Sequence, residues 1–148
     1  MVHDRRLHPP MVGPFHALLL AFPVALFPAA LVSDIAYLNT AEMQWSNFAA
    51  WLLAGGELFA GLVLIAAIFA LWKAARKARA LMYFIIILSL FVVGLVNSFQ
   101  HSRDAWSSVG TLGLWLSIAG TVLALAAGLI GYANRTATIA PDETELRR

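Results

Sequence analysis

Cysteine is absent from the 148 residues of this chain, and charged residues are scarce. Without cysteine there is no disulfide, no thiolate metal site, no iron–sulfur cluster and no covalently attached c-type haem. Charged residues make up 12% of the chain, about half of the share in soluble domains, whereas hydrophobic residues make up 61%. A chain of this size cannot hide so much apolar surface from water, so we expect its solvent to be lipid.

Sequence motifs of the common enzyme classes are missing as well. We find no Gly-rich phosphate loop, no HExxH pair and no nucleophile elbow, so no residue is identified as catalytic. The few basic residues do not interleave with aromatic residues on a polar surface, and we expect no nucleic-acid partner. We therefore interpret the chain as a membrane protein rather than an enzyme, with the lipid bilayer as its first partner.

Four apolar runs are long enough to cross a bilayer, which needs roughly 20 apolar residues per helix. They cover residues 14–38, 47–72, 80–99 and 109–132. The connections between them are short, so successive helices should be antiparallel neighbours. We predict an all-α fold, an integral-membrane bundle of four transmembrane helices over residues 14–134, with a tail at 1–13 and another at 135–148.

Lys and Arg residues are distributed unequally between the two sides of the predicted bundle. Arg103 lies alone on one side. The other side carries the nine remaining residues: Arg5, Arg6, Lys73, Arg76, Lys77, Arg79, Arg135, Arg147 and Arg148. Because positive residues stay in the cytoplasm, we predict that both tails are cytoplasmic. The first apolar run is long and lacks a small-residue cleavage pattern, so we interpret it as an anchor rather than a signal peptide.

The densest polar stretch, NSFQHSRDAW, begins at the predicted outer end of the third run. Together with Asp34, near the outer end of the first run, it predicts a polar cluster. Its members are Asp34, Asn97, His101, Arg103 and Asp104. Charges near hydrocarbon need partners, so we predict a structural network in which Arg103 pairs with Asp34 or with Glu42. Asp104 would cap the turn into the last helix.

Glu57 lies in the second run at a depth near the middle of the bilayer. Two interpretations stay open. A neutral Glu57 could bond to a backbone carbonyl or a serine of a neighbouring helix, which Gly55, Gly56 and Gly61 would allow to approach. Alternatively, Glu57 serves as a proton relay or ligand, since intramembrane carboxyl groups often mark functional sites.

A b-type haem is the cofactor to weigh in a small four-helix membrane protein. Bis-His ligation needs two imidazoles at the same depth. The candidates His16 and His101 are predicted at opposite ends of the bundle, about 30 Å apart. We therefore expect no cofactor, and a haem b only where two chains each contribute one His at a subunit interface. The spacing of His3, His8 and His16 matches no tight metal motif, and we predict no metal site.

Small residues recur on one side of the fourth run. They are Gly113, Ser117, Gly120, Ala124 and Gly128. Such a pattern favours close helix packing, either inside one chain or between chains. A homo-oligomer or a larger membrane complex is therefore open.

Two segments carry a resemblance to a known family. HALLLAFPVALFPAALVSDIAY contains His16, Phe22-Pro23 and Asp34, and VNSFQHSRDAWSSVGTLGLWLSIAGTVLALAAGLIGY contains an Asn-x-x-x-His-x-Arg-Asp turn. Over residues 14–134 they resemble the bacterial membrane-protein family called domain of unknown function 2231. The chain departs from that family at Ala21, where a second His often stands, and at Ala105, where Gly is common.

The resemblance implies a four-helix domain of the bacterial inner membrane and supplies no activity. Its layout is similar to that of small b-type cytochromes, which keeps a redox role open. From the missing motifs and the small-residue pattern, we predict a structural, accessory or assembly subunit without enzyme activity. The alternative is a redox or proton-handling membrane protein that uses Glu57 and the polar cluster.

Overall fold

The computed structural model describes residues 12–74, 77–103 and 109–133. In this part of the chain it has four helices, α1 (Pro14–Thr40), α2 (Met43–Lys73), α3 (Lys77–His101) and α4 (Thr111–Tyr132). Each helix is long and apolar enough to cross a membrane, so the predicted all-α, four-helix fold is confirmed. The helix ends differ from the predicted ones by a few residues, since α2 begins at Met43 rather than at 47. A count of apolar residues ends at the first polar residue, whereas the backbone hydrogen bonds of the helix continue past that residue.

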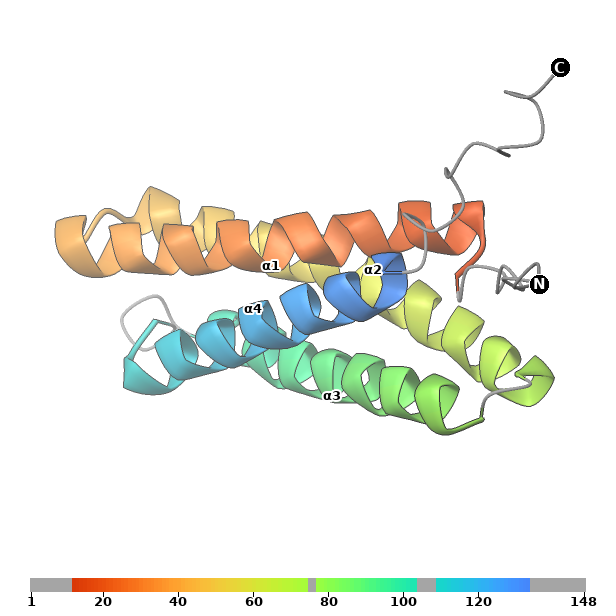
Figure 1. Cartoon of the computed structure of the whole chain (residues 1–148). Coiled ribbons are helices and arrows are strands. Elements are labelled where there is room, and N and C mark those ends of the chain that lie inside the picture. The colour runs from red at the N-terminus through yellow and green to blue at the C-terminus, as the bar shows by residue number, and fades with distance from the viewer. Residues whose placement is uncertain (1–11, 75–76, 104–108, 134–148) are drawn as a thin grey trace, which may run out of the picture.

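The helices alternate in direction around the bundle (Figure 1). Each of α1 and α3 packs against α2 and α4, so α1 and α3 face each other diagonally and run parallel. The start of α1 and the end of α4 lie at one end of the bundle, which we call the His16 end. The end of α1 and the end of α3 lie at the opposite end, which we call the His101 end.

A tight connection reverses the chain between α1 and α2. Ala41 adopts a left-handed conformation with φ of 57° and donates its backbone N–H to the Tyr37 carbonyl at 2.7 Å. Such a residue closes the last helical turn by satisfying a carbonyl that has no partner within the helix. Glu42 then returns to an extended conformation and precedes α2. The reversal is complete within two residues, so α1 and α2 must pack side by side.

Phe27 occupies the centre of the bundle, where it is 1% exposed. Three glycines, one on each of the other helices, make room for its ring. A Cβ atom would lie 3.1 Å from the ring at Gly56, 2.7 Å at Gly94 and 2.8 Å at Gly120. Real Cβ atoms essentially never approach carbon within 3.0 Å, so the ring requires glycine at positions 94 and 120, whereas an alanine at position 56 would need the ring to shift slightly.

The small-residue pattern of α4 packs inside the chain. Gly113, Ser117, Gly120, Ala124 and Gly128 are all buried. An added Cβ would lie 2.9 Å from Val24 at Gly128 and 2.7 Å from Leu20 at Gly131, both contacts being with α1. The pattern therefore brings α4 close to α1, which was one of the two predicted uses.

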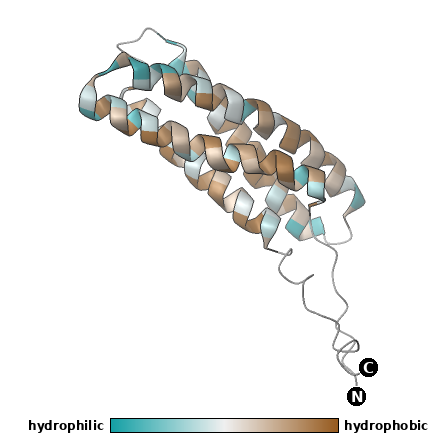
Figure 2. Cartoon of the chain, turned by 90° about the horizontal axis from the view of Figure 1, so that it is seen from above, coloured by the Kyte–Doolittle hydropathy of each residue, from teal (hydrophilic) through white to brown (hydrophobic). Residues whose placement is uncertain are grey.

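Hydrophobic residues run along the length of the helices, and hydrophilic residues gather towards the two ends of the bundle (Figure 2). Large side chains such as Phe15, Trp51 and Leu129 are 73%, 79% and 75% exposed. A soluble monomer rarely exposes a continuous apolar surface of this kind. Lipid is the solvent that suits it.

Candidate functional site

Four polar side chains form a closed ring of hydrogen bonds at the His101 end. Asn97 donates its side-chain N–H to Ser117 Oγ at 2.9 Å, and Ser117 donates to Asp34 Oδ2 at 2.5 Å. The other carboxyl oxygen, Asp34 Oδ1, lies 2.8 Å from His101 Nε2. His101 Nδ1 closes the ring on the Asn97 backbone carbonyl at 3.0 Å. We call these four residues the polar ring, and it joins α1, α3 and α4.

The bonds of the polar ring dictate where the protons lie. A carbonyl only accepts, so His101 Nδ1 carries a proton and donates it to Asn97. One further proton lies between His101 Nε2 and Asp34 Oδ1. The pair is thus either an imidazolium beside a carboxylate or a neutral imidazole beside a carboxylic acid. In both forms every ring nitrogen and both carboxyl oxygens are bonded.

Burial separates the polar ring from solvent and lipid. Asp34, Asn97 and Ser117 are 0% exposed, and His101 is 6% exposed. Within the ring, the side-chain oxygen of Asn97 is the one buried polar atom that has no hydrogen-bond partner among the described residues. A buried hydrogen-bonded network contributes to a unique packing of its helices, whereas a broken one is costly. The hydroxyl of Ser117 donates to the carboxyl group of Asp34 rather than to an imidazole, so it is not arranged as an activated nucleophile. The polar ring is therefore suited to holding the three helices together.

Arg103 does not pair with Asp34, the first of its two predicted partners. Asp34 is bonded inside the polar ring, and the Arg103 guanidinium instead donates to Gln100 Oε1 at 3.4 Å on the exposed side of the chain. A long Arg side chain at a helix end reaches water, where its charge needs no buried partner. The sequence placed Arg103 and Asp34 at the same end but did not give the rotation of the helices. Asp104 lies outside the described residues.

A second diagonal contact joins α1 to α3 at the His16 end. His16 Nε2 lies 2.8 Å from the Tyr83 hydroxyl. Asp34 follows His16 by 18 residues, and His101 follows Tyr83 by 18 residues. Eighteen residues are five helical turns, roughly 27 Å, so both contacts lie on one face of each helix. Side-chain contacts therefore join α1 to α3 at both ends of the bundle.

The two haem candidates do not suit iron ligation in this arrangement. His16 and His101 lie at opposite ends of the bundle, as the topology predicted. Both nitrogens of His101 are occupied by Asn97 and Asp34, so none is free to bind iron without breaking the ring. His3 and His8 lie outside the described residues.

Glu57 is the fifteenth of the 31 residues of α2, which places it at the middle of the span as expected. It is 9% exposed, and neither carboxyl oxygen has a hydrogen-bond partner among the described residues. The predicted bond to a backbone carbonyl or a serine is therefore not formed there. Its Oε2 occupies the space where residue 94 would carry a Cβ, so Gly94 of α3 is the glycine that admits it.

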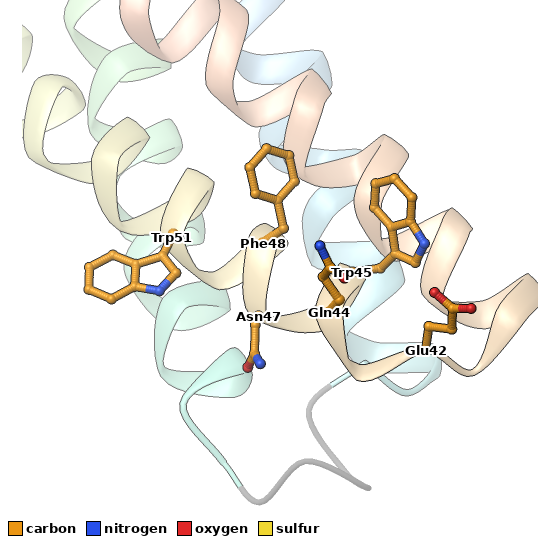
Figure 3. Close-up of a pocket in the computed structure, with 6 residues that line it drawn as sticks. All are labelled: Glu42, Gln44, Trp45, Asn47, Phe48 and Trp51. Atoms are coloured by element: carbon orange, nitrogen blue, oxygen red, sulfur yellow. The ribbon is translucent and has the colours of Figure 1, made fainter.

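A shallow hollow at the beginning of α2 is lined by Glu42, Gln44, Trp45, Asn47, Phe48 and Trp51. The side chains diverge from one another in Figure 3, with Trp51 directed away from Trp45. They do not converge on a common point where a ligand would sit. Trp side chains at the end of a span are typical of the membrane interface, and we assign them that role.

Sequence reasoning missed two members of these contacts. Ser117 was placed only in the small-residue pattern, and Tyr83 was not identified as the partner of His16. Each is a single polar residue within a long apolar helix. Its partner depends on how the helices are rotated about their own axes. The polarity of Ser117 at a buried small-residue position was the one available signal.

The model of a protein family described as predicted membrane protein (DUF2231) matches residues 13–136. No curated protein and no solved structure matches the chain. The matched residues include all four helices and every member of the polar ring. The chain therefore belongs to the family of predicted membrane proteins DUF2231.

Proposed function

We propose that this chain is a structural or accessory subunit of a membrane assembly and that it catalyses no reaction itself. The polar ring carries the proposal. Its Ser, His and Asp side chains are bonded to one another and closed off from substrate, which supports a role in holding three helices together. A catalytic site needs at least one reactive group that a substrate can reach.

The exposed surface of the helices supports a role in binding a partner protein. Only about a third of each span is buried within the chain, namely 33% for α1, α2 and α3 and 39% for α4. Membrane helices associate through van der Waals packing and interhelical hydrogen bonds between faces that the monomer leaves uncovered. A homo-oligomer and a larger complex both use such faces.

Photocrosslinking in native membranes tests the proposal. A photoreactive residue is placed singly at one lipid-facing position of each helix: Leu18, Trp51, Ile85 and Trp115. A subunit of an assembly gives discrete protein adducts from one or two faces, and only lipid adducts from the others. Two differently tagged copies of the chain then distinguish self-association from a different partner. Lipid adducts alone from all four positions would contradict the proposal.

We also propose that the membrane is the bacterial inner membrane and that the His16 end faces the cytoplasm. The excess of Lys and Arg at that end supports this orientation. Within the described residues, Lys73 and Lys77 lie there and Arg103 lies at the opposite end.

Proton handling is a second candidate function, and Glu57 is the observation that favours it. Glu57 has no hydrogen-bond partner among the described residues. Such an intramembrane carboxyl group is costly and often marks a functional site. The Glu57→Gln variant keeps the shape and loses the exchangeable acid. If the cellular phenotype of a deletion strain is complemented fully by Glu57→Gln, this candidate is excluded.

A further inference from the structure

A hollow of about 470 Å³ opens at the His16 end, where α2 ends and α3 begins. Leu71 and Trp72 of α2 line it, together with Lys77, Ala78 and Leu81 of α3. We call it the Lys77 hollow. Among the described residues its lining is apolar except for the Lys77 ammonium group, so it offers one cation beside an apolar surface.

Trp72 places the Lys77 hollow at the membrane interface. It follows Glu57, at the middle of the span, by 15 residues, which is roughly 22 Å along the helix. The hydrocarbon of one leaflet is about 15 Å thick, so Trp72 lies at the level of the lipid headgroups. Its indole is 75% exposed and packs edge-on against Phe69, with ring centroids 5.8 Å apart. Leu81 lies one helical turn deeper than Lys77, so the hollow continues from the headgroups towards the hydrocarbon.

The charge beside the hollow is positive. Lys73 is the last residue of α2, and Lys77 is the first residue of α3. The acidic residues that the structure describes lie elsewhere, two at the His101 end and Glu57 at mid-span. No carboxylate of the described residues therefore balances the two ammonium groups, and an anion is the ligand that the charge favours.

The apolar walls narrow the choice of anion. A small inorganic ion bound to Lys77 would leave Trp72 and Leu81 uncovered. A phospholipid joins a phosphate to acyl chains, so its headgroup reaches Lys77 while one chain lies along Trp72 and Leu81. A zwitterionic headgroup carries its own cation, whereas an anionic headgroup leaves its negative charge to the protein.

We propose that the Lys77 hollow binds the headgroup and one acyl chain of an anionic phospholipid, with the Lys77 ammonium group bonded to the phosphate. Basic pockets between transmembrane helices recognise anionic headgroups in this way. The inference goes beyond the accessory role, and it depends neither on that role nor on the orientation of the chain in the membrane.

Quenching of Trp72 fluorescence by brominated lipids tests the inference. The full chain keeps Trp72, and its four other Trp residues are replaced by Phe. Vesicles contain phosphatidylcholine and phosphatidylglycerol, one of them brominated in its acyl chains close to the glycerol. Quenching across the lipid ratios gives the affinity for phosphatidylglycerol relative to phosphatidylcholine. We expect about a fivefold preference, the contribution of one basic residue at the membrane surface, and Lys77→Gln should reduce it to less than about twofold. A parent chain without preference would overturn the inference.

Two matched controls separate a site from general attraction to a basic surface. A chain that keeps only Trp51, which is 79% exposed on the same helix, should show a preference below about twofold. Lys73→Gln removes an equal charge next to Trp72 but does not alter the lining, so it should keep a preference of at least about threefold. The same preference at Trp51, or equal losses in Lys73→Gln and Lys77→Gln, would show diffuse attraction and overturn the inference. Helicity confirms that each variant folds.

Glycerol phosphate in excess distinguishes a lipid from a soluble anion. It carries the phosphate without acyl chains, so it should leave the quenching by brominated phosphatidylglycerol unchanged. Loss of that quenching would assign the hollow to a soluble anion and overturn the inference as well.

Discussion

Replacing Gly120 by Ala should destabilise the bundle because the added methyl group meets a ring that has nowhere to move. The new Cβ would lie 2.8 Å from Phe27 Cδ1, and Phe27 is 1% exposed. Overpacking of a close-packed core typically costs about 1–3 kcal/mol, and a rigid ring favours the upper part of that range. Ala is favoured over Gly in a helix by about 1 kcal/mol, so the expected net loss is about 2 kcal/mol.

Gly55→Ala is the matched control on another helix. Its Cβ would lie 3.4 Å from Leu26 Cδ1, the flexible end of a side chain at an ordinary contact distance. The control should be neutral or stabilised by up to about 1 kcal/mol. The two variants are therefore expected to differ by about 2–3 kcal/mol, and the intrinsic helix preference cancels in the comparison.

Unfolding of the full chain in mixed micelles, followed by circular dichroism, measures this difference. Combining Gly120→Ala with Phe27→Leu should recover part of the loss, because the shorter side chain leaves space for the methyl group. The two changes should then be coupled by about 1–2 kcal/mol. Equal stabilities of Gly120→Ala and Gly55→Ala would refute the packing of Phe27 among the three glycines.

Three further predictions address the His16 end, the topology and the cofactor. Tyr83→Phe removes the partner of His16 and should cost about 1–2 kcal/mol of unfolding free energy in the same assay; an unchanged stability would contradict the contact. Because the chain has no native cysteine, single Cys residues at the exposed positions Asn39 and Ala78 report topology, and an impermeant maleimide applied to intact cells should label only Asn39→Cys. The protein purified after expression with supplied haem should be colourless when oxidised and when reduced; a Soret band would instead favour a haem at a subunit interface.

The sequence predicted the features that depend on position along the chain. The four spans, the central depth of Glu57 and the opposite ends of His16 and His101 follow from counting residues along apolar runs. It also placed Asp34, Asn97 and His101 at one end of the bundle. These predictions need only helix length and the alternation of direction.

The sequence did not predict the features that depend on how each helix is rotated about its own axis. Each helix is apolar on most sides, so no amphipathic stripe distinguishes the face that packs from the face that meets lipid. Arg103 was therefore predicted as the partner of Asp34 or of Glu42, whereas His101 is the residue that bonds to Asp34 and Arg103 is exposed. The role of Gly94 beside Glu57 was missed for the same reason, because either side of α3 could have faced α2.

The polar ring holds α1, α3 and α4 together, and a double-mutant cycle on Asp34 and His101 tests this role. The unfolding free energy is measured for the parent chain, Asp34→Leu, His101→Leu and the double variant. Each single change strands a buried polar or charged partner and should cost about 3–5 kcal/mol, whereas the double variant leaves an apolar pair and should be at least as stable as either single variant. Costs that simply add would contradict this role, because they would show that Asp34 and His101 do not stabilise the bundle through each other.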